Sequence, residues 1–159
     1  AAIAAEHRAP SILMHNRRKP NDAALDLRLG GRYVGAKYDD LLGEIRQELL
    51  ESVSLALDAG VEKDHIILDA GIGFGKTVDQ NLELLNRQDE ICALGYPVLL
   101  GPSRKSFIGY TLDAPPDQRL EGTAAAAAVG ISRGVDIIRV HDVAAMVKVA
   151  RMTDAIVRR

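Results

Sequence analysis

Four short apolar runs recur along the chain, and each is followed by a cluster of polar residues. Runs of this length that stop at glycines or charged residues are typical of buried β-strands. The segments between the runs are longer and carry apolar residues at helical spacing. The pattern therefore predicts strands at residues 11–15, 65–69, 96–101 and 135–141, each followed by a helix.

The clearest helix prediction covers residues 38–59. Its apolar residues fall on one helical face, and Gly60 follows where a left-handed cap residue belongs. Thr77 and Gln80 have the spacing of a capping box, which predicts a helix over residues 78–94 that ends at Gly95. The apolar positions of the first of these two helices are Leu42, Ile45, Leu49, Val53 and Ala56.

The remaining segments are less regular. Two more helices are expected, one through the alanines at 124–128 up to Gly134 and one over residues 143–157. We interpret the five consecutive alanines as close packing of a helix on a sheet. Residues 1–7 are expected to be the last turns of another helix, and a polar loop with Pro20 is predicted after the first strand.

Alternation of near-continuous apolar strands with helices predicts parallel βαβ units in an α/β fold. In such folds a ligand lies beyond the carboxyl ends of the strands, so the polar clusters that follow the strands should converge on one pocket. Arg139 and His141 are two residues apart and should point to the same side of their strand. The four clusters are residues 15–17, Asp69 with the glycines that follow, residues 103–106 and residues 139–142.

Composition narrows the class of protein. A chain of 159 residues with 47% hydrophobic residues can bury one core, but it is shorter than the roughly 200 residues that a small eight-stranded α/β barrel needs. The net charge is −2 and the sequence pI is about 6.1, which argues against a nucleic-acid partner. The single Cys92 excludes a disulfide framework, and no run approaches membrane-spanning length.

The central stretch is residues 66–77, IILDAGIGFGKT. An acid at the tip of a buried strand, followed by alternate glycines, indicates a functional loop, although an ordinary strand-to-helix turn remains an alternative. A phosphate-binding P-loop would need glycine where the chain has Ala70. A dinucleotide-binding loop would need glycine in place of Lys76.

Four motifs together carry a family resemblance: LMHNR, LDAGIGFGKT, PVLLGPSRKSFIG and GTAAAAAVGISRGVDIIRVHDV. They closely resemble the C-terminal half of the dihydropteroate synthase family of pterin-binding barrels, which sulfonamides inhibit. The resemblance implies four parallel βα units, about strands 5–8 of a TIM-type (β/α)8 barrel, in a single partial domain over residues 1–159. Ala70 departs from the family, which usually has proline there.

The resemblance also implies an activity. Members of the family condense a 7,8-dihydropterin-6-ylmethyl diphosphate with p-aminobenzoate and release pyrophosphate, a step of folate biosynthesis in the cytoplasm. Ionisation of the C–O bond is thought to come first. Mg²⁺ is the expected cofactor, with its ligand in the half that these motifs do not cover and no metal ligand in this chain. The full-length enzyme is expected to be a homodimer, whereas the isolated chain is expected to be inactive.

Site residues follow from the same motifs. Asp69 matches the aspartate that holds the pterin ring, and a carboxylate suits that role because it accepts N–H donors. Its alternative role is to cap the glycine turn. Lys105 is expected between the two substrates, and Arg139 and His141 at the diphosphate. The other expected substrate-binding residues are Met14, Gly73, Phe74, Gly101 and Ser106.

The motifs leave the roles of some residues and two alternative functions open. Arg104 is expected to be structural, and His7 and His65 match no family position. A methyltetrahydrofolate-binding methyltransferase of the same superfamily would keep an aspartate like Asp69 but would not need the SRKSF or RVHD motifs. A P-loop NTP-binding protein is the third candidate.

Overall fold

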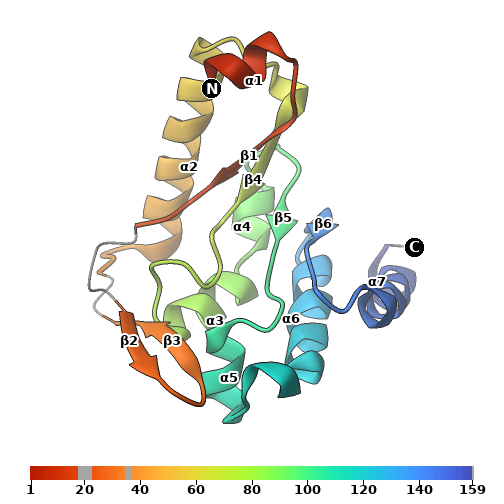
Figure 1. Cartoon of the computed structure of the whole chain (residues 1–159). Helices are drawn as coiled ribbons and strands as arrows, with labels where there is room; N and C mark the ends of the chain where they lie inside the picture. The colour runs from red at the N-terminus through yellow and green to blue at the C-terminus, as the bar shows by residue number, and fades with distance from the viewer. Residues whose placement is uncertain (18–22, 35–36, 159) are drawn as a thin grey trace.

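The computed structural model describes residues 1–17, 23–34 and 37–158. Its centre is a row of short parallel strands that follow one another in chain order. β1 pairs with β4 in the register Ser11↔Ile66, a bridge between Leu68 and Val98 joins β4 to the segment that enters β5, and β5 pairs with β6. The strands are β1 (Ser11–Met14), β4 (Ile66–Asp69), β5 (Leu99–Leu100) and β6 (Ile137–Ile138) (Figure 1).

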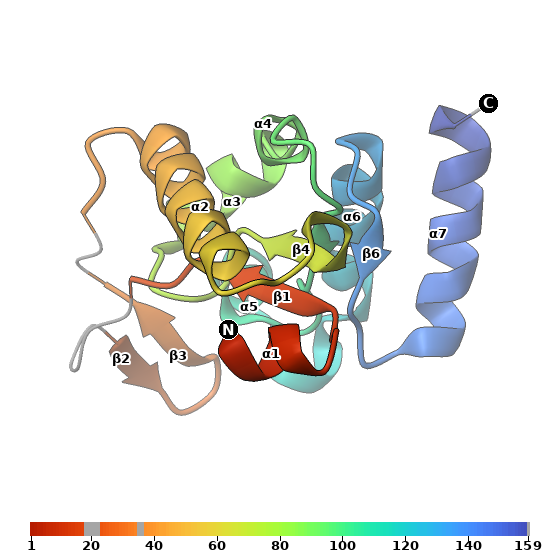
Figure 2. The ribbon, with the colours of Figure 1, turned by 90° about the horizontal axis from the view of Figure 1, so that it is seen from above.

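Helices cover one side of this row. Seen from above, α2, α3, α4, α6 and α7 form an arc along the strands (Figure 2). The sequence predicted this parallel α/β arrangement, and the structure confirms it for the described residues. Their bounds are α2 (Leu41–Asp58), α3 (Val78–Asn86), α4 (Asp89–Cys92), α6 (Leu120–Ser132) and α7 (Val143–Val157).

Helix α2 shows why the predicted apolar face folds as it does. The Asp40 side chain accepts a hydrogen bond from the backbone N–H of Gly43 and so caps the first turn. The five predicted apolar positions are all buried, and burial of each large side chain contributes roughly 1.5–3 kcal/mol. Gly60, with φ of +91°, follows the helix as predicted.

The prediction of one helix over residues 78–94 is wrong in one respect, because this segment forms two helices. The capping box of Thr77 and Gln80 opens α3 as expected. The helix then ends at Asn86, and α4 begins at Asp89. Gln88 is fully buried at the junction, where the sequence has neither glycine nor proline to signal a break.

The third and fourth predicted strands are longer than the strands that the structure shows there. β5 and β6 contain two residues each, and Arg139 and His141 lie past the end of β6. The backbone N–H of Arg139 still donates to the carbonyl of Leu100 (2.9 Å), so pairing with β5 continues one residue beyond the strand.

The sequence pattern did not predict a hairpin of two strands or a short helix after the third polar cluster. β2 (Ala23–Asp26) and β3 (Gly30–Tyr33) form an antiparallel hairpin, and α5 (Ser106–Leu112) follows the third polar cluster. The hairpin strands lack an apolar alternation, and their turn is held by Asp26, whose carboxylate accepts from the N–H groups of Arg28 and Leu29. Pro20 of the predicted polar loop lies outside the described residues.

The first and last helices agree with the sequence. α1 (Ala2–Glu6) precedes β1, and α7 lies beside α6. The alanine run lies in α6, where Ala126 and Ala127 are buried. None of the described helices is long and apolar enough to cross a membrane.

Candidate active site

Asp69 ends strand β4 and is only 4% exposed. Its Oδ1 accepts a hydrogen bond from the backbone N–H of Gly71 (2.7 Å), so the carboxylate does cap the glycine turn. Burial raises the pKa of Asp69, while this hydrogen bond and the charge of Lys105 oppose the rise. A carboxylate offers about four acceptor positions, so one backbone bond leaves capacity for a ligand.

The loop after Asp69 requires glycine at two close approaches. Gly71 has φ of +71°, and a Cβ there would lie 1.9 Å from the carbonyl oxygen of His15. Gly73 has φ of +76°, and a Cβ there would lie 2.5 Å from Cδ of Lys105. Any larger residue would therefore displace either the end of β1 or the lysine of the next loop.

Lys105 bridges the loops that follow β4 and β5. Its ammonium group donates to the backbone carbonyl of Ile72 and lies 4.3 Å from the centre of the Phe74 ring. Burial lowers the pKa of Lys105 to about 8, while the charge of Asp69 opposes the fall. The side chain is thus mainly cationic at pH 7, and its interaction with the aromatic face is a cation–π contact.

A cavity of about 290 Å³ lies beyond the ends of β5 and β6. Arg139 and His141 both line it. Ser103 Oγ accepts from the backbone N–H of His141 (3.2 Å) and lies 2.9 Å from Nδ1 of the same residue. Two cationic side chains and an imidazole make this cavity suited to an anion. Its lining residues are Gly101, Ser103, Lys105, Arg139, Val140 and His141.

Gly101 has little room for a side chain. A Cβ there would lie 3.0 Å from one terminal nitrogen of Arg139 and 3.2 Å from its Nε. Glycine at this position therefore lets the guanidinium group lie against the backbone at the end of β5.

The other expected substrate-binding residues lie around this centre. Met14 is the register partner of Asp69 on the neighbouring strand and is half-exposed, so it is not a core residue. Ser106 is the first residue of α5. Arg104 forms a two-pronged ion pair with Asp142 (2.6 and 3.0 Å), in keeping with the expected structural role.

The first polar cluster is placed differently from the expectation. Neither His15 and Arg17 nor Asp69 with its glycines lines the cavity, which residues of the third and fourth clusters form. His15 Nε2 lies 3.0 Å from the carboxylate of Glu48 on α2, and Arg17 binds Glu48 and Glu44 of the same helix. His15 does not reach the cavity because it is buried behind the glycine loop, next to the carboxylate of Glu48 on α2.

Sequence reasoning missed two buried cations. Lys76 is 1% exposed and contacts His15, and Arg119 is 2% exposed and binds three backbone carbonyls. Long charged side chains are rarely buried to this extent. The pattern of polar and apolar residues therefore predicts that such side chains are exposed. A lysine directly after a glycine loop was the only sequence cue, and it pointed to phosphate binding.

The inward position of Lys76 also bears on the P-loop alternative. In a P-loop the lysine reaches the phosphates. Here its ammonium group donates instead to the carbonyls of Gly71 (3.2 Å) and Phe74 (3.1 Å). The loop therefore uses its lysine internally, which argues against nucleotide binding.

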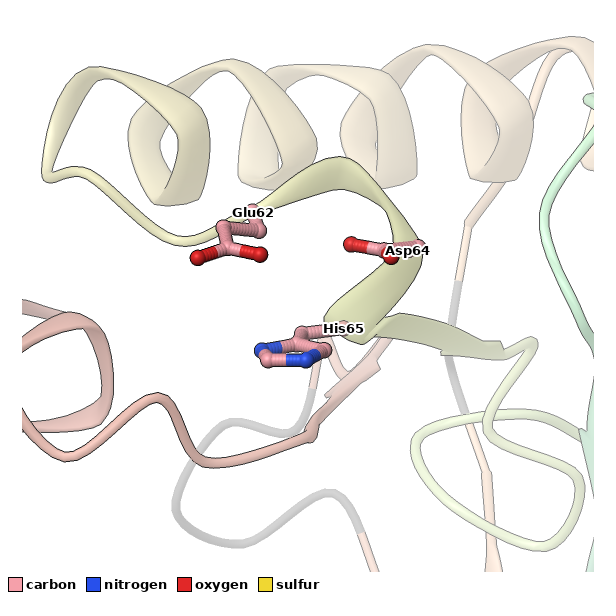
Figure 3. A group of neighbouring side chains, drawn as sticks. All are labelled: Glu62, Asp64 and His65. Carbon is pink, nitrogen blue, oxygen red and sulfur yellow. The ribbon is translucent and has the colours of Figure 1, made fainter.

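Among the residues that the structure describes, one group of side chains is close enough to hold a metal ion. Glu62, Asp64 and His65 lie on the turn before β4, with ligand atoms within 4.8 Å of one another (Figure 3). Glu62 and Asp64 are exposed, and Glu62 pairs with Arg8 (3.0 Å). The group precedes β4, whereas Asp69 ends it, so the two lie at opposite ends of the strand.

Comparison with known proteins places these motifs in context. The family described as "Pterin binding enzyme" matches residues 1–141. The dihydropteroate synthase of Bacillus subtilis is 46% identical over the whole chain, which covers 50% of that protein. That of Clostridium beijerinckii is 45% identical over the whole chain, which covers 54% of that protein. The chain therefore spans about half the length of these curated relatives.

Solved structures give the same result. A Clostridium difficile dihydropteroate synthase crystallised in the presence of pteroic acid is 43% identical, with a TM-score of 0.86 over 99% of this chain and 54% of that one. A Yersinia pestis dihydropteroate synthase in a sulfonamide complex is 34% identical, with a TM-score of 0.87 over 96% of this chain and 53% of that one.

Proposed function

Because the chain belongs to the pterin-binding enzyme family, we propose that it supplies the C-terminal half of the active site of a dihydropteroate synthase. One observation carries the proposal: Asp69 at the end of β4, Lys105 after β5 and Arg139 after β6 lie at the carboxyl ends of consecutive parallel strands, and the charges of Lys105 and Arg139 act on the Asp69 carboxylate. An acceptor for the pterin and cations for the diphosphate are thus grouped at one end of the sheet.

The pterin would bind through Asp69. The amino group and ring N–H of a pterin present adjacent donors, and a carboxylate accepts such a pair. Its burial strengthens these bonds because water competes less for them. Met14, beside Asp69 on β1, would form a wall of the same pocket.

The diphosphate would bind in the cavity of Arg139 and His141. A guanidinium group offers a planar fork of donors that matches phosphate oxygens. Since Ser103 Oγ accepts from the backbone of His141, its own proton can go to Nδ1. That arrangement leaves Nε2–H of His141 as a donor to a phosphate oxygen.

Lys105 would separate the two substrates. When the C–O bond of the dihydropterin-methyl diphosphate breaks, negative charge develops on the leaving pyrophosphate, and Lys105 and Arg139 would stabilise it. The amine nitrogen of p-aminobenzoate then forms the new C–N bond and loses one proton. Phe74, Gly73 and Ser106 would line the side of the pocket that receives p-aminobenzoate.

Mg²⁺ is the cofactor that the resemblance implies, and it requires oxygen ligands. The residues that line the cavity include no carboxylate. They do not form a Mg²⁺ site by themselves, so the cations that this chain offers the diphosphate are Lys105 and Arg139. We propose that the Mg²⁺ ligand lies in the other half of the enzyme.

The remaining expectations are part of the same proposal. We place residues 1–159 in one partial domain that corresponds to strands 5–8 of a barrel. We also propose a homodimer for the full-length enzyme and a cytoplasmic location, which the free Cys92 supports.

A hybrid enzyme tests the proposal. This chain would replace the matching half of the Bacillus subtilis relative, and dihydropteroate formation would be measured with both substrates and Mg²⁺. We expect turnover from the hybrid and a loss of at least tenfold in kcat/KM after Asp69→Asn. The matched control is Asp79→Asn on the exposed first turn of α3. A folded hybrid without turnover, or equal effects of the two substitutions, would overturn the proposal.

A further inference from the structure

Lys76 is a buried cation that the proposed reaction does not use. Its ammonium nitrogen lies 3.0 Å from His15 Nδ1, 3.1 Å from the carbonyl oxygen of Phe74 and 3.2 Å from that of Gly71. An ammonium group has three N–H donors, so the three neighbours satisfy it completely. This match indicates a charged lysine with a specific task.

The contact with His15 extends to helix α2. Because Nδ1 of His15 faces the lysine, Nδ1 is the acceptor and Nε2 carries the proton. Nε2 lies 3.0 Å from Glu48, and the other carboxylate oxygen of Glu48 accepts from Nε of Arg17 (2.6 Å). A continuous series of close polar contacts thus runs from the glycine loop through the end of β1 to α2.

We propose that Lys76 is a positioning residue of the site, whose ammonium group fixes the glycine loop of residues 70–75 to the end of β1 and, through His15 and Glu48, to helix α2. The proposed link between the loop, β1 and α2 depends on these contacts alone. The effect on substrate binding rests on the proposed function.

The geometry of the loop explains why this position matters. The carbonyl of Gly71 accepts from Phe74 N–H as well as from Lys76, so the lysine closes the turn that presents Phe74. Phe74 and Gly73 in turn contact Lys105. A change at Lys76 should therefore reach the boundary between the two substrates although Lys76 itself touches neither.

The protonation state of Lys76 should control whether the turn that presents Phe74 stays closed. Burial lowers the pKa of Lys76 to about 7. A neutral amine has two N–H groups for three acceptors, so the loop should loosen as the pH rises above 7. Four charged groups also act on this lysine: Asp69 and Glu48 raise its pKa, and Lys105 and Arg17 lower it.

Native-state hydrogen exchange on the full 159-residue chain tests the proposed link between the loop, β1 and α2. In Lys76→Met, which keeps length and removes the charge, the amides of Gly71, Gly73 and Phe74 should exchange at least tenfold faster than in the wild type. Amides of α6 should change much less. The control is Lys148→Met on the exposed face of α7, which should leave the loop unchanged.

Rescue separates the charge from the shape of the side chain. A Lys76→Cys variant in a Cys92→Ala background would be alkylated with 2-bromoethylamine in denaturant and refolded, which restores an ammonium group at nearly the original position. Loop protection should return. Equal acceleration of all amides in Lys76→Met, or loop exchange that the rescue does not restore, would overturn the proposal. If Lys76→Met precipitates, Lys76→Gln is judged by the same criterion.

The functional consequence is measured in the hybrid enzyme. Lys76→Met should raise KM for p-aminobenzoate at least tenfold with a smaller change in kcat. The wild-type KM should rise more steeply between pH 6.5 and 8.5 than that of the variant, because Lys105, with a pKa of about 8, titrates in this window in both. Unchanged KM values with altered loop exchange would refute only the link to substrates. Failure of the unsubstituted hybrid would count against the proposed function instead.

Discussion

The ammonium group of Lys105 lies 4.3 Å from the centre of the Phe74 ring. The two residues belong to the loops that follow β5 and β4, so their contact joins neighbouring βα units at the end of the sheet where the substrates are proposed to meet. The lysine also donates to the carbonyl of Ile72 in the same glycine loop. One side chain thereby connects both walls of the proposed pocket.

This position predicts different effects for two adjacent residues. In the hybrid enzyme, Lys105→Ala should impair the use of both substrates, because the cation is proposed to lie between them. Ser106→Ala should mainly raise KM for p-aminobenzoate. Steady-state kinetics with each substrate varied in turn would distinguish the two, with Lys148→Ala as the control. A Ser106 variant with altered pterin binding and normal p-aminobenzoate kinetics would reverse the assignment.

Arg139 should be required for the leaving group. Arg139→Ala should lower kcat/KM of the hybrid by an amount that corresponds to a loss of about 2 kcal/mol or more in transition-state stabilisation. The reason is that a charge contact to the departing pyrophosphate is lost. Pyrophosphate binding measured by calorimetry should weaken in parallel. Arg151→Ala, an exposed arginine of α7, is the matched control. Wild-type pyrophosphate affinity in Arg139→Ala would contradict the assignment.

Arg119 should be required for stability. Its guanidinium group donates to the carbonyls of Ala114 (2.9 Å), Arg104 (2.8 Å) and Leu29 (2.9 Å), and so holds the β2–β3 turn against the loop that carries Lys105. Arg119→Met would leave these buried acceptors unpaired, at a cost of about 1–3 kcal/mol each.

Urea denaturation measures this effect. The free energy of unfolding should fall by at least about 3 kcal/mol in Arg119→Met, a large share of the stability of a typical domain. It should change little in Arg133→Met, because Arg133 is an exposed arginine at the end of α6. Equal changes in the two variants would show that the three carbonyls find other partners.

The sequence predicted what local periodicity and capping determine. The apolar face of α2 and the capping box of α3 depend on residues within a few positions of each other, so the pattern is sufficient. The polar ends of β4 and β6 could be placed near each other because parallel strands expose their carboxyl ends on one side.

The residues that the sequence could not place depend on partners far along the chain. Arg119 is buried because Leu29 supplies a carbonyl, and Lys76 is buried because His15 supplies an acceptor. The β2–β3 hairpin is held in part by Tyr110, whose hydroxyl donates to the carbonyl of Gly30 (3.0 Å). No spacing rule connects such residues before the fold is known.

Burial of His15 predicts a loss of stability in acid. Burial lowers the pKa of His15 to about 4, and the charge of Lys76 adds to the effect. The unfolded chain binds this proton from about pH 6.5, so between pH 6.5 and 4 the unfolded state carries more protons. The free energy of unfolding should fall across that window, by up to about 1.4 kcal/mol per pH unit from this residue.

Variants isolate the contribution of His15 from that of other groups. In His15→Asn the slope of the free energy of unfolding between pH 6.5 and 4 should be shallower than in the wild type, whatever the absolute stability. His7→Asn, at an exposed position, should keep the wild-type slope. Thermal or urea denaturation at several pH values provides the measurement, and an unchanged slope in His15→Asn would mean that the histidine binds its proton equally in both states.

The outer strands predict the behaviour of the chain in solution. Among the described strands, β1 pairs only with β4 and β6 only with β5, so each has one open edge. Ile12 on β1 is 51% exposed and Ile137 on β6 is 37% exposed. Unpaired backbone groups beside exposed apolar side chains promote association. Four parallel strands are also too few to close a barrel of this type, which needs eight.

We therefore expect residues 1–159 to self-associate and to make no dihydropteroate without the other half of the site. Sedimentation equilibrium should show dimers or larger species. Ile12→Lys should shift the distribution toward monomer because a charge on an edge strand opposes pairing. Leu55→Lys, at an exposed position of α2, should not, because it leaves both edges open.

A coupled assay with both substrates and Mg²⁺ should detect no turnover. A monomer with measurable turnover would show that a complete site exists within these residues, and the half-barrel interpretation would then be wrong.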